Sequence, residues 1–309
     1  MTPEEYSFPR YLAAKKSVDD RALNRQVLQV MREFLQSLPF QRPLKVLEIG
    51  AGIGTMLERL MDWNLLTEVE YTAIDSELDN IDFAQQRLQE WAAQINFQIV
   101  KRGDNLQFST TRGEILVKLL AVDLYDFLEQ DQRKGSWDLL IAHAFLDLID
   151  VPTTLLRIMN LIQNGGSFYF SINYDGLTVL QPPIDGEFDE LVLELYHRTM
   201  EERMYAGLQF GDRYTGRHLF EHIQQSAGRI LASGSSDWVV YPGVAGYPED
   251  ESYFLHFIIH TIYLALENQM ELDGKQFSDW IRQRHEQVDR QELVYISHQL
   301  DYFGIRPSA

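Results

Sequence analysis

Residues 44–55, LKVLEIGAGIGT, decide how the rest of the chain is interpreted. The apolar run predicts a buried strand and IGTMLERLMDW (53–63) predicts a helix, so the glycines between them fall at a strand-to-helix turn. An acid inside the strand, Glu48, precedes glycines at alternate positions, Gly50, Gly52 and Gly54. Glycine lets a ligand approach the backbone closely, and free N–H groups at a helix start favour a carboxylate or phosphate. The stretch therefore indicates a nucleotide-type cofactor site, with a tight turn that binds nothing as the alternative.

Strand and helix patterns alternate along most of the chain. The expected strands are 44–49, 68–75, two short strands around a turn at Gly103, Asp104 and Asn105, a strand ending at Asp123, and then 137–145, 167–173, 229–241 and 291–304. The expected helices are 17–38, 53–63, 78–94, 152–163, 190–205, 215–226, 251–268 and 276–289. This alternation predicts an α/β fold with a doubly wound, mostly parallel sheet, whose ligand lies beyond the carboxyl ends of the strands.

The same pattern divides the chain into four expected parts. Residues 1–40 form an N-terminal helical cap and residues 41–173 the cofactor-binding core. Residues 174–228 form a helical insertion over the acceptor site, and residues 229–309 complete the core with late strands and helices. The insertion leaves the sheet from the end of a strand, where ligands bind in such folds, so we expect it to act as a lid together with the N-terminal helix.

A strongly acidic composition narrows the possible partners of the 309-residue chain. Lys and Arg number 27 against 46 Asp and Glu, a formal charge of −19, which repels phosphate backbones and anionic lipid surfaces. Nucleic acid and membrane partners are therefore not expected. The absence of cysteine excludes disulfides, zinc-thiolate sites and cysteine nucleophiles. No apolar signal segment or run of membrane length is found, so we expect a cytoplasmic protein.

Four motifs together are more specific than the loop alone. They are VLEIGAGIGT (46–55), the acid of YTAIDSE (71–77), VDLYDF (122–127) and WDLLIAHAFLDLI (137–149). In this order they resemble the class I S-adenosylmethionine-dependent methyltransferases over about residues 44–173, and the two late strands fit that family's closing antiparallel hairpin. Thr55 stands where the dinucleotide pattern G-x-G-x-x-G needs glycine or alanine. The resemblance therefore implies a Rossmann-like methyltransferase fold and S-adenosyl-L-methionine as cofactor, with S-adenosyl-L-homocysteine as its product.

The resemblance also implies which residues hold the cofactor. The backbone at Gly50–Gly54 would receive the carboxylate of its methionine portion, and Glu48 would hold the ammonium. Asp75 would accept hydrogen bonds from the ribose hydroxyls and Asp123 from the adenine amine, with a helix cap as the alternative role for Asp123. The complete predicted set is Glu48, Gly50, Ala51, Gly52, Gly54, Asp75, Ser76, Asp123, Leu124 and Ala142.

His143 is the predicted catalytic residue. It follows the fourth main strand, at the sheet edge toward which the methyl group should point. Methyl transfer is an in-line displacement that needs alignment, and a base only where the acceptor must lose a proton. Histidine suits that role near neutral pH, and a structural histidine bonded at the strand end is the alternative. The predicted activity is methyl transfer to an oxygen or nitrogen of a small-molecule acceptor.

Two further classes of protein remain open. An NAD(P)-dependent oxidoreductase would use the same loop, but it is disfavoured by Thr55 and by the arrangement of the late strands. A non-catalytic relative would keep the cofactor site with a blocked acceptor site around His143.

Other noticeable side chains have weaker functional interpretations. His256 and His260 are four residues apart, as in some metal sites, but no glutamate follows His256 and no third ligand is evident, so no metal is expected. His197 and Arg198 are interpreted as solvated helix surface, with contact to an acidic substrate as the alternative. Four aromatic residues would either line an acceptor pocket or pack in the core: Tyr174, Trp238, Tyr241 and Tyr253.

Overall fold

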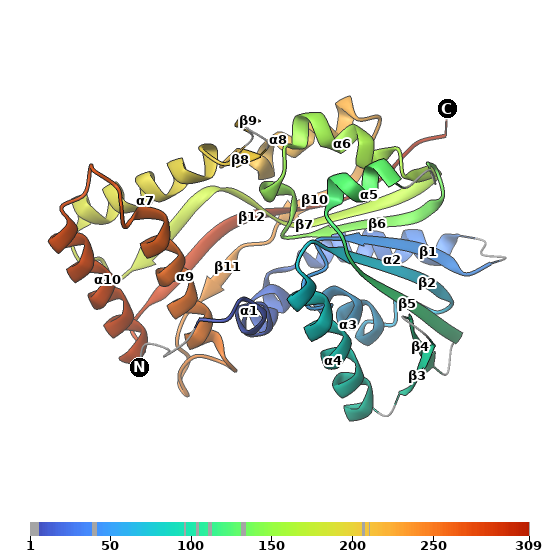
Figure 1. The fold of residues 1–309 in the computed structure, drawn as a ribbon, viewed down its shortest axis with the longest axis horizontal. Helices are drawn as coiled ribbons and strands as arrows, with labels where there is room; N and C mark the ends of the chain where they lie inside the picture. Colours follow the sequence, from blue (N-terminus) through green and yellow to red (C-terminus); the bar gives the residue numbers. More distant parts are fainter. Residues whose placement is uncertain are drawn as a thin grey trace.

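The computed structural model describes residues 6–38, 42–95, 97–102, 105–110, 113–130, 134–205, 208–209 and 211–308. A large mixed sheet forms its centre, in the order β10-β12-β7-β6-β1-β2-β5-β4-β3, with β11 paired to β12 (Figure 1). Its parallel strands are β1 (Leu44–Ile49), β2 (Val69–Asp75), β5 (Gly113–Ala121), β6 (Trp137–His143) and β7 (Ile162–Gln181). Its antiparallel strands are β3 (Gln98–Arg102), β4 (Asn105–Thr110), β10 (Arg229–Ser235), β11 (Trp238–Val240) and β12 (Val294–Ile305).

Helices cover both faces of the parallel strands. Successive residues of each strand point to opposite faces, so Val46 and Leu47 belong to two different hydrophobic clusters. The cluster around Val46 includes side chains of α2 (Arg25–Ser37), α3 (Thr55–Asp62) and α4 (Leu78–Gln94). The cluster around Leu47 includes side chains of α5 (Leu124–Gln130), α6 (Val151–Met159) and α8 (Thr215–Gln225), with the short 3-10 helix η1 (Leu146–Leu148) beside them. The predicted doubly wound, mostly parallel sheet is therefore confirmed.

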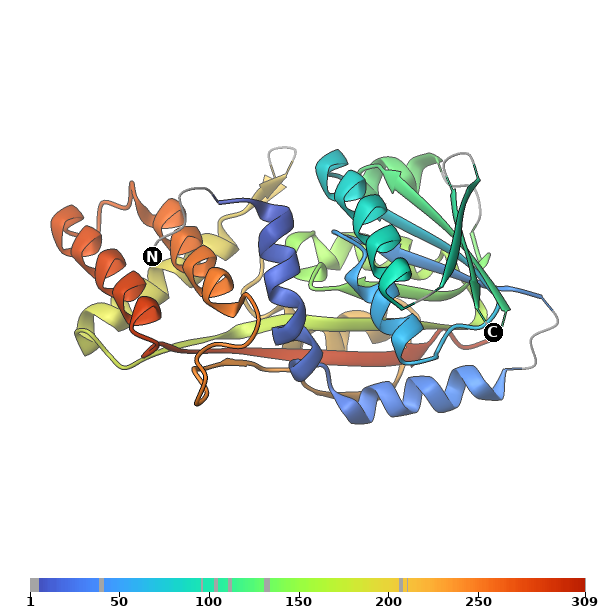
Figure 2. The same cartoon turned by 90° about the horizontal axis from the view of Figure 1, so that it is seen from below.

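A second lobe grows out of the long strands β7 and β12. Both strands continue past the core, and their far ends carry β11, α7 (Gly186–Glu201), α9 (Glu251–Leu266) and α10 (Gly274–Asp289), as Figure 2 shows. We call this part, residues 174–201, 238–240, 251–289 and 294–299, the second lobe. A small hairpin of β8 (Met204–Tyr205) and β9 (Leu208–Gln209) follows α7. The β7–β12 pairing from Ile305 with Ser167 to Val294 with Gln181 joins the lobe to the core along one sheet.

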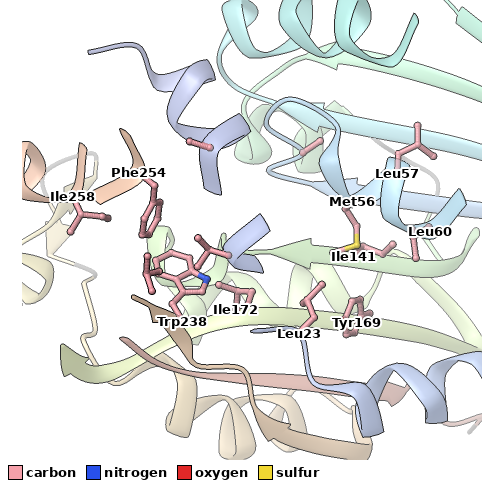
Figure 3. Packing of buried hydrophobic residues seen from close by; sticks show 14 of the residues in the cluster. Leu23, Met56, Leu57, Leu60, Ile141, Tyr169, Ile172, Trp238, Phe254 and Ile258 are labelled. Carbon is pink, nitrogen blue, oxygen red and sulfur yellow. The ribbon is translucent and has the colours of Figure 1, made fainter. Parts of the chain in front are cut away.

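Helix α1 (Phe8–Ala22) lies between the core and the second lobe (Figure 2). It is tied to the lobe by Ser17, whose Oγ donates to Glu251 Oε1 at 2.6 Å, and by Arg10, whose Nε lies 3.0 Å from Asp250 Oδ2. Figure 3 shows apolar side chains of one cluster continuing from α3, at Met56 and Leu60, along one face of the sheet to Trp238 and Ile258. The two parts therefore share one hydrophobic core.

Several predicted boundaries are wrong, for identifiable reasons. The helix expected at 17–38 is two helices, because Asn24 accepts hydrogen bonds from the N–H groups of Gln26 and Val27 and so begins a new one. The helix expected at 152–163 ends at Met159, and a strand already starts at Ile162.

That strand, β7, does not stop at 173, because its partner β12 continues beside it to Gln181. The insertion helix expected at 190–205 runs from Gly186 to Glu201, and the strand expected at 229–241 is split into β10 and β11. Of the predicted turn at 103–105, Gly103 and Asp104 lie outside the described residues. In the described part of the chain, no helix combines the length and the apolar character needed to span a membrane.

Candidate functional site

The glycine loop (50–54) requires glycine at its first two alternate positions. Gly50 and Gly52 have φ angles of 67° and 53°, in the left-handed region that other residues adopt at a cost. A Cβ on Gly52 would lie 3.0 Å from Cδ1 of Leu12 in α1, and a Cβ on Gly50 would lie 2.1 Å from Cδ2 of Phe145. The loop is therefore approached closely from both the N-terminal helix and the segment after β6.

Backbone hydrogen bonds within the loop limit its predicted role as a carboxylate receptor. The N–H of Ala51 donates to Ile74 O at 3.0 Å, and that of Gly54 donates to Ala51 O at 3.0 Å. The N–H of Gly52 donates to Asp75 Oδ2 at 2.8 Å. Three N–H groups of this turn are thus already hydrogen-bonded within the protein, two of them to β2.

Asp75 and Asp123 stand at the ends of neighbouring parallel strands and both line the cavity described below. Besides Gly52, Asp75 accepts from the N–H of Glu77 and from Asn80 Nδ2, each at 3.0 Å through Oδ1. Because a carboxylate has about four acceptor positions, Asp75 retains room for a ligand donor. Asp123 Oδ1 accepts from the N–H of Tyr125 at 2.7 Å, so Asp123 caps the helix that begins at Leu124. The same residue also lines the cavity.

One cavity of about 550 Å³ gathers most of the predicted site. Its wall in the core includes Gly50, Ala51, Gly52, Asp75, Ser76, Asp123, Leu124 and His143. The rest of its wall comes from α1 and from every strand and helix of the second lobe except α10. The size is typical of pockets that enclose a cofactor or drug-sized molecule. The cavity thus joins the glycine loop to the second lobe.

Three predicted cofactor residues are not among the residues that line this cavity: Glu48, Gly54 and Ala142. Glu48 is 1% exposed and accepts the Tyr71 hydroxyl at 2.6 Å, while burial raises the pKa of its carboxyl to about 7. Gly54 serves as the N-cap residue of α3, and Ala142 is buried within β6. Ala144, two residues later and at a φ of 50°, lines the cavity in place of Ala142.

A buried cluster of charges fixes α1 against the core. Asp19 Oδ2 lies 2.7 Å from Lys15 Nζ and 3.4 Å from Arg59 Nη2, and Asp19 Oδ1 accepts from Trp238 Nε1 at 2.8 Å. Burial by itself would raise the pKa of Asp19, but the charge of Lys15 and the contact with His143, together with Arg59, hold it well below its usual range. Lys15 also lines the cavity, one helical turn from Leu12.

His143 lines the cavity as predicted, but both of its ring nitrogens have protein partners. Nε2 lies 3.0 Å from Asp19 Oδ2, and Nδ1 lies 2.9 Å from Ser171 Oγ. Burial lowers the pKa of His143 to about 4, so the ring is neutral near pH 7. Its role as a base stays a prediction, and these contacts agree better with the structural alternative. Ser171 is fully buried, so the Ser171–His143–Asp19 chain offers no accessible nucleophile.

The second lobe contributes residues that the sequence did not single out. Of the four aromatic candidates, Tyr174 and Trp238 line the cavity, whereas Tyr241 is 57% exposed and Tyr253 is buried against Ser7. The lining residues without any prediction include Tyr11, Asp147, Tyr196, Arg203, Tyr295 and Gln299. Asp147 lies in the WDLLIAHAFLDLI motif of the core, Tyr11 comes from α1, and Arg203 follows α7. Tyr196, Tyr295 and Gln299 belong to the second lobe, which the pairing of β7 with β12 joins to the core.

His256, His285 and His197 are buried side chains. His256 approaches His285 rather than His260, with an Nδ1–Nδ1 distance of 2.8 Å, and burial lowers the pKa of both to about 4. Among the described residues, no group of three His, Cys, Asp or Glu side chains is placed to hold a metal ion. The surface interpretation of His197 is wrong, because this residue is only 7% exposed; its neighbour Arg198 pairs with Glu271.

Comparisons with known proteins add similarity of fold alone. No family model and no curated protein sequence matches the chain. It is similar to the YcgJ protein of Bacillus subtilis (TM-score 0.46, 10% identity, 91% of this chain and 100% of that chain). It is also similar to a geranyl diphosphate methyltransferase in complex with S-adenosylmethionine (0.44, 8%, 98% and 92%). A third is phosphoethanolamine N-methyltransferase 2 of Haemonchus contortus (0.44, 12%, 99%), of which the chain spans 59%.

Proposed function

We propose that the chain is an S-adenosylmethionine-dependent methyltransferase that acts on an oxygen or nitrogen of a small-molecule acceptor. One observation carries the proposal: a single cavity is lined at one side by the glycine loop and the strand-end acids Asp75 and Asp123, and at the other by the second lobe. This layout provides adjoining places for a cofactor and an acceptor, as a transfer between two bound molecules requires.

The residues of the core fit the cofactor in most respects. Asp75, with Glu77 beside it in the cavity wall, supplies acceptors for ribose hydroxyls, and Asp123 with Leu124 supplies the adenine contacts. Because three loop N–H groups are used internally and Glu48 faces Tyr71, Lys15 is the candidate partner for the carboxylate of the methionine portion. When bound, the cofactor supplies a methyl group activated by a positively charged sulfonium.

The contribution of the chain to such a transfer is alignment and exclusion of water. Helix α1 packs Leu12 over the glycine loop, and its side chains Phe8 and Tyr11 complete the cavity wall. A site walled in this way orients the two reactants and limits the access of water, and such alignment is worth about 7–11 kcal/mol of a barrier in well-oriented reactions. His143 remains the candidate base for an acceptor that must lose a proton.

Calorimetric titration with S-adenosylhomocysteine, S-adenosylmethionine and NAD tests the cofactor. We expect binding of both adenosyl ligands and no comparable heat with NAD, and tight NAD binding alone would refute the proposal. Asp75→Ala should weaken adenosylhomocysteine binding by about 1–3 kcal/mol, since charge-assisted hydrogen bonds and the support of Gly52 are lost together. An unchanged affinity in that variant would show that the ribose is held elsewhere.

Turnover of a known acceptor tests the proposed base. His143→Ala should lower kcat while the affinity for S-adenosylhomocysteine stays nearly unchanged, because the partner of a base is the acceptor. Loss of cofactor binding or of folding in this variant would assign His143 to the structural cluster around Asp19 instead.

A further inference from the structure

The second-lobe side of the cavity has an aromatic wall. Tyr174, Tyr196, Trp238 and Tyr295 line it. Phenols are uncharged at neutral pH, and burial moves the pKa of these three still further above the usual value. The Trp238 indole is held in place by its 2.8 Å hydrogen bond to Asp19. Rigid aromatic side chains of this kind bind flat, apolar molecules.

The charges around the cavity do not favour an anionic acceptor. Among the described lining residues the permanent cations are Lys15 and Arg203. Lys15 Nζ lies 2.7 Å from Asp19, and Arg203 donates to the backbone oxygen of Asp147 at 2.7 Å. Four carboxylic side chains line the same cavity: Asp75, Glu77, Asp123 and Asp147. Asp75, Glu77 and Asp123 belong to the cofactor side, where Lys15 is also assigned, and Arg203 is already bonded to Asp147. A phosphate on the acceptor would therefore find no unpaired cation among the described lining residues.

Gln299 places in this wall a side-chain oxygen that lacks a hydrogen-bond partner among the described residues. The residue lines the cavity and is only 2% exposed. Its Nε2 donates to Ser297 Oγ at 3.4 Å, but its Oε1 has no hydrogen-bond partner among the described residues. A buried, unpaired carbonyl oxygen is unfavourable, and a hydrogen-bond donor on a bound molecule would satisfy it.

We propose that the methyl acceptor is an uncharged aromatic small molecule with a hydroxyl or N–H group that donates a hydrogen bond to Gln299 Oε1. This inference rests on the proposed methyltransferase function and specifies its substrate class. The aromatic wall favours a ring, the cations of the described cavity wall are already paired and so do not favour an anion, and Gln299 favours a hydrogen-bond donor.

Three matched naphthalene probes test the inference by calorimetry on the full chain, with and without saturating S-adenosylhomocysteine. They are 2-naphthol, its ether 2-methoxynaphthalene, which lacks the donor, and 2-naphthyl phosphate. We expect 2-naphthol to bind at least about fivefold more tightly than the ether and at least about tenfold more tightly than the phosphate. Equal binding of alcohol and ether, tightest binding of the phosphate, or no binding of any probe would overturn the inference.

Two glutamine variants test whether Gln299 accepts the hydrogen bond from the hydroxyl of 2-naphthol. Gln299→Met should bring the affinity for 2-naphthol down to that for the ether. Gln107→Met is the matched control, because Gln107 is also a buried glutamine whose Oε1 lacks a partner among the described residues, but it lies on β4 and not in the cavity wall. If folded Gln299→Met still binds 2-naphthol more tightly than 2-methoxynaphthalene, the assignment of Gln299 is refuted. If that variant does not fold, the comparison of the three probes on the wild-type chain decides whether the proposed acceptor class is correct. A separate titration with S-adenosylhomocysteine alone tests the cofactor proposal, so its failure can be told apart from failure of the proposed acceptor class.

Discussion

Replacement of His143 by glutamine should reduce the loss in the free energy of unfolding that the protein undergoes as the pH falls. The folded-state pKa of His143, about 4, lies below the value of about 6.5 for an unfolded histidine. As the pH falls through 6.5 the unfolded chain binds a proton that the folded chain takes up only near pH 4. The stability that comes from the neutral, buried ring is therefore fully present above pH 6.5 and is lost between pH 6.5 and 4. Glutamine keeps an amide donor for Asp19 but does not titrate.

The size of this effect follows from the two pKa values. Between pH 7 and pH 5, His143 should account for a loss of about 2 kcal/mol in the free energy of unfolding. Urea unfolding at both pH values measures it, and His143→Gln should lose about that much less than the wild type between them. Ser171→Ala is the control, because it breaks the Nδ1 contact without removing the imidazole, so its loss should equal that of the wild type. A His143→Gln variant with the wild-type pH dependence would refute the reasoning.

Three further outcomes are expected. Gly52→Val should abolish S-adenosylhomocysteine binding in calorimetry, whereas Gly274→Val, at a glycine with open space around it, should leave binding intact; retained binding by Gly52→Val would place the cofactor away from the loop. Glu48→Gln should stabilise the protein more at pH 8 than at pH 5 in urea unfolding, because burial raises the pKa of this carboxyl from 4.5 to about 7 and the resulting loss of stability accumulates between those two pH values; an equal effect at both values would contradict the raised pKa. Added S-adenosylhomocysteine should raise hydrogen-exchange protection in 8–25 and 174–205, and equal protection with and without it would show that the cap is a fixed part of the fold.

The core of the fold and the cofactor side of the site were predictable because their signals are local. Strands β1, β2, β5 and β6 are short and largely apolar, with a glycine or polar residue at or just after their ends, and strand ends meet at one edge of a parallel sheet. That rule alone brings Gly50, Asp75, Asp123 and His143 to one cavity. It does not say which way each side chain turns, so Glu48, within the strand, was placed on the cofactor although it faces Tyr71.

The second lobe was not predictable, because its polar residues are satisfied by distant partners. Asn173 and Asp175 are typical of a strand end, yet Asn173 Nδ2 donates to Leu300 O at 2.8 Å and Asp175 pairs with Arg217 at 2.8 Å. Those contacts let β7 continue, and no local pattern reveals them. Gln299 was missed for the same reason: its chemistry depends on an unpaired oxygen, which only the packed structure shows.

The 20-residue strand β7 has a mechanical consequence for the two sides of the cavity. At roughly 3.3 Å per residue it is roughly 65 Å long, and it is paired with β12 from the core into the second lobe, with irregularities in register near His298 and Asp301. Moving the lobe away from the core would therefore strain the hydrogen bonds of this shared ladder. Helix α1 adds ion pairs to the lobe, ring stacking of Tyr11 on Phe257, and the cluster around Asp19. The long pair of strands thus sets the distance between the glycine loop and the aromatic wall.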